Sequence, residues 1–183
     1  MLVDSHSHLF LEEFSDDLPQ VMQRAHDAGV THIFMPNIDS TTIGPLLSVC
    51  NTYKGFCFPM IGLHPTSVNE SYEKELDIVA HQLAPFNEYV AIGEIGLDLY
   101  WDKTFLKEQL IVFEKQIEWA LEYHLPIVVH CREAFEYIYK VLEPYKKSGL
   151  KGIFHSFCPD AKKCKAGRSQ NNRAIHTDSD RNF

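Results

Sequence analysis

The chain has 183 residues and a formal net charge of −8, and 45% of its residues are hydrophobic while 23% are charged. This balance is typical of one globular domain of ordinary size, so it excludes a wholly disordered protein. The apolar runs are strand-sized, which excludes a membrane-spanning helix, and the acidic balance argues against a protein that wraps nucleic acid through a basic surface.

Apolar runs and helical spacing alternate regularly along the chain. In chain order, the pattern predicts a strand at 1–4, a helix at 18–29, a strand at 31–35, a helix at 41–50, a strand at 56–63, a helix at 72–83, a strand at 89–93, a helix at 105–124, a strand at 126–130, a helix at 134–142 and a strand at 152–155. Because each strand is mostly apolar on both faces, we expect an α/β fold with six parallel strands buried between helices.

The composition changes at about residue 160. Residues 161–183 hold six Lys or Arg against two acidic residues, and their few hydrophobic residues follow neither a helical nor a strand period. We therefore expect residues 1–160 to form one domain, and residues 161–183 to be an atypical, disordered basic tail.

Potential metal ligands stand at or after the ends of the predicted strands. His6 and His8 follow the first strand, His64 follows the third, Glu94 follows the fourth, and His130 and His155 end the fifth and sixth. In a parallel α/β barrel these positions share the C-terminal rim, where catalytic residues collect. Five histidines and one glutamate on one rim predict a metal site rather than five separate packing residues.

The residue types suggest how such a site is divided. His6 and His8 are two residues apart, so in an extended segment both imidazoles face the same side and can bind one ion. Glu94 has two carboxylate oxygens and can bridge two cations, and His130 and His155 would complete the second ion. Two alternatives stay open, namely a polar loop without an ion at His6 and His8, and a salt bridge between Glu94 and Arg132.

Five segments carry a resemblance to a known family: Val3–His8, Ile61–Pro65, Gly93–Asp98, Leu125–Ala134 and His155–Phe157. Their order, and a spacing close to that of the family, resemble the TatD family of metal-dependent deoxyribonucleases over about residues 1–160. The resemblance implies a TIM-type (β/α)8 barrel and hydrolysis of phosphodiester bonds in DNA by metal-activated water. It also implies two divalent ions, Mg²⁺, Mn²⁺ or Zn²⁺.

The resemblance also assigns roles by position. The implied metal ligands are His6, His8, Glu94, His130 and His155. His64 and Arg132 match positions near the substrate phosphate, so that with the bridging Glu94 they form the implied catalytic set.

The sequence departs from the family toward its C-terminus. A full barrel has roughly 250 residues, and the last ligand of the family is an aspartate in a Glu-Thr-Asp motif. Only 23 residues lead from His155 to Asp178, too few for the missing strand–helix units. We therefore expect Asp178 to be an accidental match, the barrel to be incomplete, and this form to be less stable and less active than a full-length relative.

Other readings remain for the function and the setting of the chain. An amidohydrolase-type enzyme that cleaves C–N bonds shares the His-x-His pair, and an inactive, truncated product is the third alternative. The five cysteines are an odd number without disulfide-like spacing, and no signal peptide is visible. We expect a monomer in the cytoplasm, or in the nucleus if the source is eukaryotic, with DNA as substrate and no membrane partner.

Overall fold

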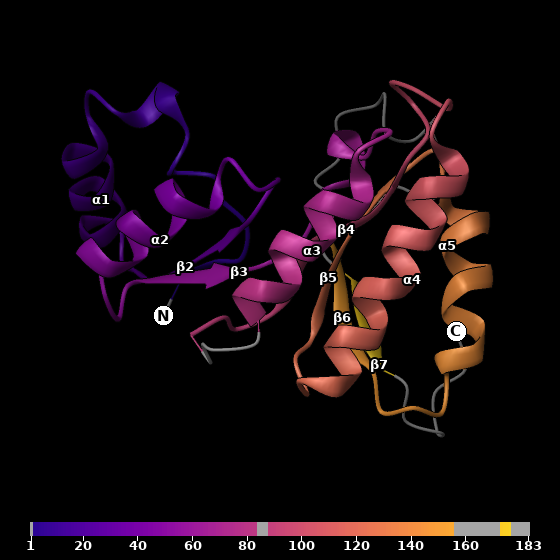
Figure 1. Ribbon diagram of the computed structural model, residues 1–183. Helices are drawn as coiled ribbons and strands as arrows, with labels where there is room; N and C mark the ends of the chain where they lie inside the picture. The colour runs from indigo at the N-terminus through magenta and orange to yellow at the C-terminus, as the bar shows by residue number, and fades with distance from the viewer. Residues whose placement is uncertain (1, 84–87, 156–172, 177–183) are drawn as a thin grey trace.

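A computed structural model describes residues 2–83, 88–155 and 173–176 (Figure 1). The main elements are β1 (Leu2–Asp4), α1 (Leu18–Asp27), β2 (Val30–Pro36), α2 (Ile43–Thr52), β3 (Cys57–Met60), α3 (Tyr72–Leu83), β4 (Ile92–Asp98), α4 (Leu106–Glu122), β5 (Ile127–Arg132), α5 (Phe135–Leu142), β6 (Lys151–His155) and β7 (Arg173–His176). Short 3₁₀ turns follow β1, β3 and α5, at η1 (Glu12–Phe14), η2 (Pro65–Ser67) and η3 (Glu143–Tyr145).

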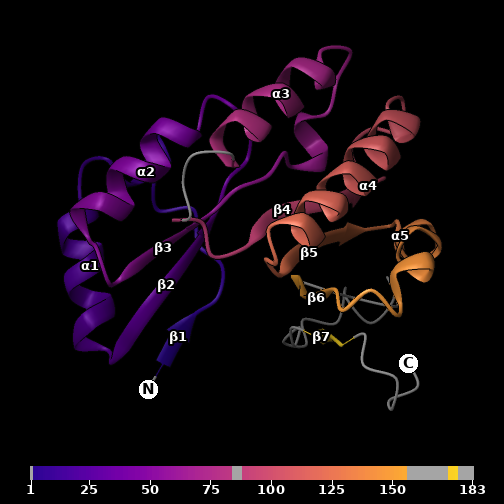
Figure 2. The same ribbon diagram turned by 60° about the horizontal axis from the view of Figure 1, so that its bottom comes forward.

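The first six strands are parallel, as the sequence predicts. One sheet has the order β1-β2-β3, and the other has β4-β5-β6 with β7 at its edge. The two sheets meet where Ile61 and Ile92 form an isolated parallel bridge. Figure 2 shows helices α1 to α5 following one another around the outer side of the strands. Because β1 to β6 are parallel, their carboxyl ends lie on the same side of the sheets.

Strand β4 differs from the sequence prediction. The predicted strand ends at residue 93, but β4 runs over Ile92–Asp98 and every residue in it is buried. Glu94 therefore lies inside the strand rather than after it. The glycines explain the difference, because Gly93 and Gly96 interrupt the apolar pattern and yet allow β4 to pack closely against β5.

Strand β7 falls within the segment for which the sequence predicts no regular structure. Residues 173–176 pair antiparallel with β6, so that Arg173 is opposite Phe154. An exposed strand edge is a template for such pairing, and four residues are too few to show a period in the sequence. Asp178 lies outside the described residues, and the boundary at residue 160 stays a prediction.

The buried side chains form two main clusters. The larger one fills the space between the β4–β6 sheet and helices α3, α4 and α5, which lie in front of that sheet in Figure 1. The smaller one lies between the β1–β3 sheet and helices α1 and α2. In the described part of the chain, no helix is both long and apolar enough to cross a bilayer.

Candidate metal centre

Asn37 joins three strands at the edge where the predicted ligands gather. Its backbone N–H lies 3.1 Å from the carbonyl oxygen of Met60 and 3.2 Å from that of Gly93, and its carbonyl accepts from the N–H of Glu94 at 3.4 Å. Its fully buried side chain donates to the carbonyl of Gly62 at 2.8 Å. The sequence analysis missed this residue, although a polar residue directly after the apolar run of β2 was a usable signal.

Glu94 is at the middle of the site. Its pairing position in β4 is skipped, because Gly93 is opposite Val128 and Ile95 is opposite Val129. The side chain is only 3% exposed, and its Oε2 lies 3.0 Å from His6 Nε2. This buried carboxylate is thus surrounded by imidazoles rather than by a Lys or Arg.

The two oxygens of Glu94 face different histidines. Oε2 lies 3.9 Å from His8 Nε2 and 3.6 Å from His64 Nε2, while Oε1 lies 3.1 Å from His130 Nδ1. Two groups of possible ligand atoms follow, each within 4.8 Å of one another: His6, Glu94 and His155, and His64, Glu94 and His130. Glu94 belongs to both groups, which is the arrangement that a bridging carboxylate requires.

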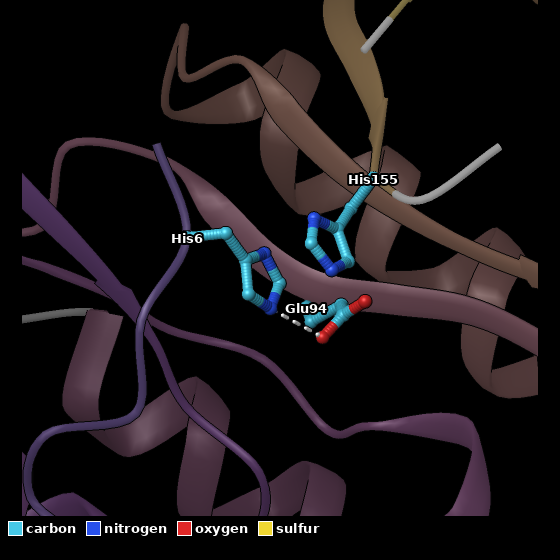
Figure 3. A group of neighbouring side chains, drawn as sticks. All are labelled: His6, Glu94 and His155. Atoms are coloured by element: carbon cyan, nitrogen blue, oxygen red, sulfur yellow. Dashed lines mark ion pairs between the residues drawn. The ribbon is translucent and has the colours of Figure 1, made fainter. Parts of the chain in front are cut away.

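Figure 3 shows how the first group is assembled. His6 comes from the segment after β1, Glu94 from β4 and His155 from the end of β6. The rings of His6 and His155 are stacked, with centroids 3.4 Å apart and planes at 12°. The sequence predicts that His155 and His130 bind the same ion, whereas here the His155 ring stacks on that of His6.

Burial and the neighbouring rings set the protonation of this cluster. Burial alone would raise the pKa of Glu94, but hydrogen bonds with His130 and His6 bring that pKa well below its usual range. Burial lowers the pKa of His64 and of His155 to about 4 in each case. At neutral pH, Glu94 is therefore an anion, and His64 and His155 are neutral imidazoles.

Asp98 extends the site beyond the predicted residues. Its Oδ2 lies 2.9 Å from His130 Nε2, and its Oδ1 accepts from the backbone N–H groups of Tyr100 and Trp101 at 3.0 and 3.3 Å. Burial acts to lower the pKa of His130, but hydrogen bonds to Asp98 and Glu94 raise it to about 9. Asp98 stands in the Gly-Glu-Ile-Gly-Leu-Asp segment, and its position at the end of a buried strand could have identified it.

Arg132 does not pair with Glu94. Its guanidinium carbon lies 3.9 Å from the ring centre of Tyr100 and 5.2 Å from that of Trp101. Among the described residues, the ion-pair partners of Glu94 are all histidines. The salt bridge considered as an alternative is therefore not formed in this part of the chain.

The donor set fits a divalent cation. Imidazole nitrogens with a carboxylate are ligands that Zn²⁺ and Mn²⁺ accept. Within the described residues, Nδ1 of His6 is buried without a hydrogen-bond partner. A buried polar atom of this kind costs free energy unless a ligand contacts it. A buried carboxylate surrounded by imidazole nitrogens is an environment in which a cation would be stabilised.

Known proteins with similar sequences include metal-dependent hydrolases. The sequence profile of the family described as TatD related DNase matches residues 3–172. The chain is 35% identical over 161 residues to the uncharacterized metal-dependent hydrolase YabD of Bacillus subtilis, a match that covers 88% of this chain and 62% of that protein. It is 32% identical over 145 residues to the 3'-5' ssDNA/RNA exonuclease TatD of Pantoea vagans, covering 79% of this chain and 55% of that one.

Solved structures show the same likeness. The crystal structure of YjjV, a TatD homolog from Escherichia coli, superposes with a TM-score of 0.79 at 27% identity, over 90% of this chain and 63% of that one. The superposition confirms a fold of the TIM-barrel type, of which the described strands form an incomplete barrel. The chain spans between about half and two thirds of the length of these relatives. From the profile match and the identity to these relatives together, the chain belongs to the TatD related DNase family.

Proposed function

We propose that this chain hydrolyses phosphodiester bonds in DNA with the help of divalent cations. The observation that carries the proposal is the position of Glu94, which belongs to both groups of possible ligands while its side chain is only 3% exposed. The proposed metal ligands are His6, His8, Glu94, His130 and His155. The two ions would be Mg²⁺, Mn²⁺ or Zn²⁺, one held near His6 and His155 and the other near His130.

Each group of side chains has a distinct part in the proposed reaction. When bound, divalent cations lower the pKa of a coordinated water and neutralise charge on the phosphate. Glu94 would be a ligand to both cations, and its backbone N–H is held by the carbonyl of Asn37. Asp98 would orient the His130 ring through the 2.9 Å contact to Nε2, as outer carboxylates do for many metal-binding histidines.

His64 is better suited to contact the substrate than to bind metal. The backbone N–H of Thr66 donates to His64 Nδ1 at 3.2 Å, so the proton of the neutral ring lies on Nε2. That nitrogen faces Glu94 and His130, and it can donate a hydrogen bond to a phosphate oxygen held there. Arg132 would supply the positive charge for the next phosphate of the chain.

Two further observations favour hydrolysis of a phosphodiester in nucleic acid over hydrolysis of a C–N bond. The bridging position on β4 is held by Glu94, whereas amidohydrolase-type sites commonly use a modified lysine there. The names of the family and of one relative, DNase and ssDNA/RNA exonuclease, point to nucleic acid as the substrate class. A monomeric state and a cytoplasmic location stay predictions of the sequence.

The proposal is tested by Glu94→Gln, which keeps the size of the side chain and removes its charge. We expect the unaltered chain to release nucleotides from an end-labelled single-stranded oligonucleotide, to lose this activity with a chelator, and to regain it with Mn²⁺, Mg²⁺ or Zn²⁺. Glu94→Gln should lower the rate by about 10² or more, because removal of a catalytic carboxylate has costs of that order.

Metal binding gives a second measurement that does not depend on turnover. Calorimetric titration with Mn²⁺ should show weaker binding to Glu94→Gln than to the unaltered chain. The matched control is Glu118→Gln, which removes the same charge from an exposed position on α4 and should change neither measurement. Equal activity and equal metal affinity in Glu94→Gln would show that Glu94 has only a structural role.

A further inference from the structure

A cavity of about 210 Å³ opens beside the candidate metal centre. Its wall combines aromatic, polar and acidic side chains, among them Thr66, Asn69, Asp98, Trp101, Asp102 and Phe105. No role has been assigned above to most of these residues, and the mixture of flat apolar surface with hydrogen-bonding groups is typical of a small-molecule site.

Two residues of the cavity wall contact two histidines of the centre. Thr66 Oγ1 lies 2.7 Å from His64 Nδ1, and Asp98 Oδ2 lies 2.9 Å from His130 Nε2. A group bound in the cavity would therefore be separated from the candidate centre by one layer of side chains.

Trp101 is unusually exposed to solvent for so large an aromatic side chain. It is 70% exposed, and the adjacent Tyr100 is 50% exposed. Their backbone is nevertheless held, because both N–H groups donate to Asp98. The Arg132 guanidinium lies over the Tyr100 ring and near the Trp101 ring, so a cation lies beside an exposed aromatic residue of the cavity wall.

Charge decides which part of a nucleotide suits each position. The cavity wall carries the carboxylates Asp98 and Asp102 and, among the residues that line it, no Lys or Arg, so a phosphate would be repelled there. A base has no net charge, and its amino groups can donate hydrogen bonds to carboxylate or amide oxygens. The counter-charge for the phosphate is Arg132, which lies against Tyr100 and Trp101 and is not one of the residues that line the cavity.

We propose that the cavity binds one base of a single-stranded nucleic acid, stacked on Trp101, while Arg132 holds the adjoining phosphate. The choice of nucleic acid rests on the proposed function. Single strands are favoured because a base in a duplex is paired and stacked, and its release costs free energy. Base stacking on an aromatic side chain needs no particular sequence.

The test is binding of a fluorescent phosphorothioate oligothymidylate, which resists hydrolysis, to the whole chain as purified. Trp101→Ala should weaken binding about fivefold or more, because stacking of one base is worth about 1–3 kcal/mol. Trp101→Phe should restore part of the loss. Arg132→Ala should weaken binding mainly at low salt, because it removes one phosphate contact and with it part of the salt dependence.

Two comparisons guard against indirect effects. Tyr139→Ala is the matched control, because Tyr139 is an exposed aromatic residue on α5 with the Lys146 ammonium 4.9 Å from its ring centre. It should bind the oligonucleotide like the unaltered chain. Thermal unfolding should be unchanged in Trp101→Ala, since a side chain that is 70% exposed contributes little to the core.

The outcomes separate this inference from the proposed function. If Trp101→Ala binds the single strand as tightly as the unaltered chain, or if a blunt duplex binds equally well, the base-binding role of the cavity is wrong, even where metal-dependent hydrolysis is found. If the unaltered chain hydrolyses nothing and yet Trp101→Ala loses binding, the cavity proposal stands and the proposed hydrolase activity fails.

Discussion

At the scale of single residues, Gly96 shows how closely β4 must approach the centre. Its φ is +136°, a conformation that side chains with a Cβ rarely adopt, and an added Cβ would clash with the carbonyl oxygen of His130. The backbone of His130 can therefore lie against β4 only because position 96 has no side chain. The glycine contributes to the site without touching any ligand.

We expect Gly96→Ala to lower the free energy of unfolding by about 1–3 kcal/mol, the cost of overpacking and of strained backbone. Urea denaturation measures this change, and calorimetry should show weaker metal binding because His130 is displaced. Gly44→Ala is the control: position 44 lies in α2 with open space around it, so alanine there should be neutral or slightly stabilising. Equal stability of the two variants would contradict the packing argument.

At the scale of elements, α4 supports the site through two buried glutamines seven residues apart. Gln116 Oε1 accepts from the N–H of Leu63 at 2.7 Å, and its Nε2 donates to the Leu63 carbonyl at 3.2 Å. Gln109 makes the same pair of bonds to Asp98, at 3.0 and 3.3 Å. One helix face thus satisfies backbone groups of Asp98 and of Leu63, the residue before His64.

Gln116→Leu should destabilise the chain by about 1–3 kcal/mol for each of the two backbone groups that it leaves buried without a partner. Chemical denaturation measures the loss. Gln23→Leu is the matched control, because the Gln23 side chain is exposed on α1 and bonds only to Asp27 in the described structure, so its loss should stay within about 0.5 kcal/mol. A similar small effect at position 116 would mean that water replaces the lost bonds.

The sequence predicts the helices and strands better than the buried polar residues that hold the site in place. Helices α1 to α5 were found because their apolar residues recur at helical spacing, and the shared strand edge was found because parallel strands end together. Gln109 and Gln116 were not found, since a polar residue within an apolar stripe looks like an interruption of the pattern. The end of β4 was misplaced because Gly93 and Glu94 resemble the beginning of a loop. Only the tertiary structure shows which polar residues are paired.

At the scale of the whole molecule, the two clusters of buried residues differ in size. The larger one has 23 described buried residues and the smaller one has eight. The sheets that belong to them are joined by an isolated bridge, by the bonds of Asn37, by a bond from the Val90 N–H to the Pro59 carbonyl, and by a small apolar cluster of Met60, Ala91 and Val128. The smaller of the two main clusters is expected to open before the larger one.

Cysteine labelling in increasing urea would measure this order. Burial raises the pKa of Cys50 to about 12 and that of Cys57 and Cys131 to about 11, so at pH 8 the folded thiols are almost entirely protonated and react slowly. Cys50 and Cys57 belong to the smaller cluster, and Cys131 packs against the larger one. We expect Cys50 and Cys57 to be alkylated at lower urea than Cys131. Labelling of all three together would indicate a single cooperative unit.

The position of the ligands across the two sheets has a thermodynamic consequence. His6 follows β1 in the first sheet, whereas Glu94 and His155 belong to strands of the second. A cation held by all three would bind only while the sheets are docked, so by mass action it would oppose their separation, by about 2.7 kcal/mol at a free concentration one hundred times its dissociation constant. The metal would then stabilise the contact between the two sheets. Chelation would increase the difference between the urea concentrations at which Cys50 and Cys131 are labelled.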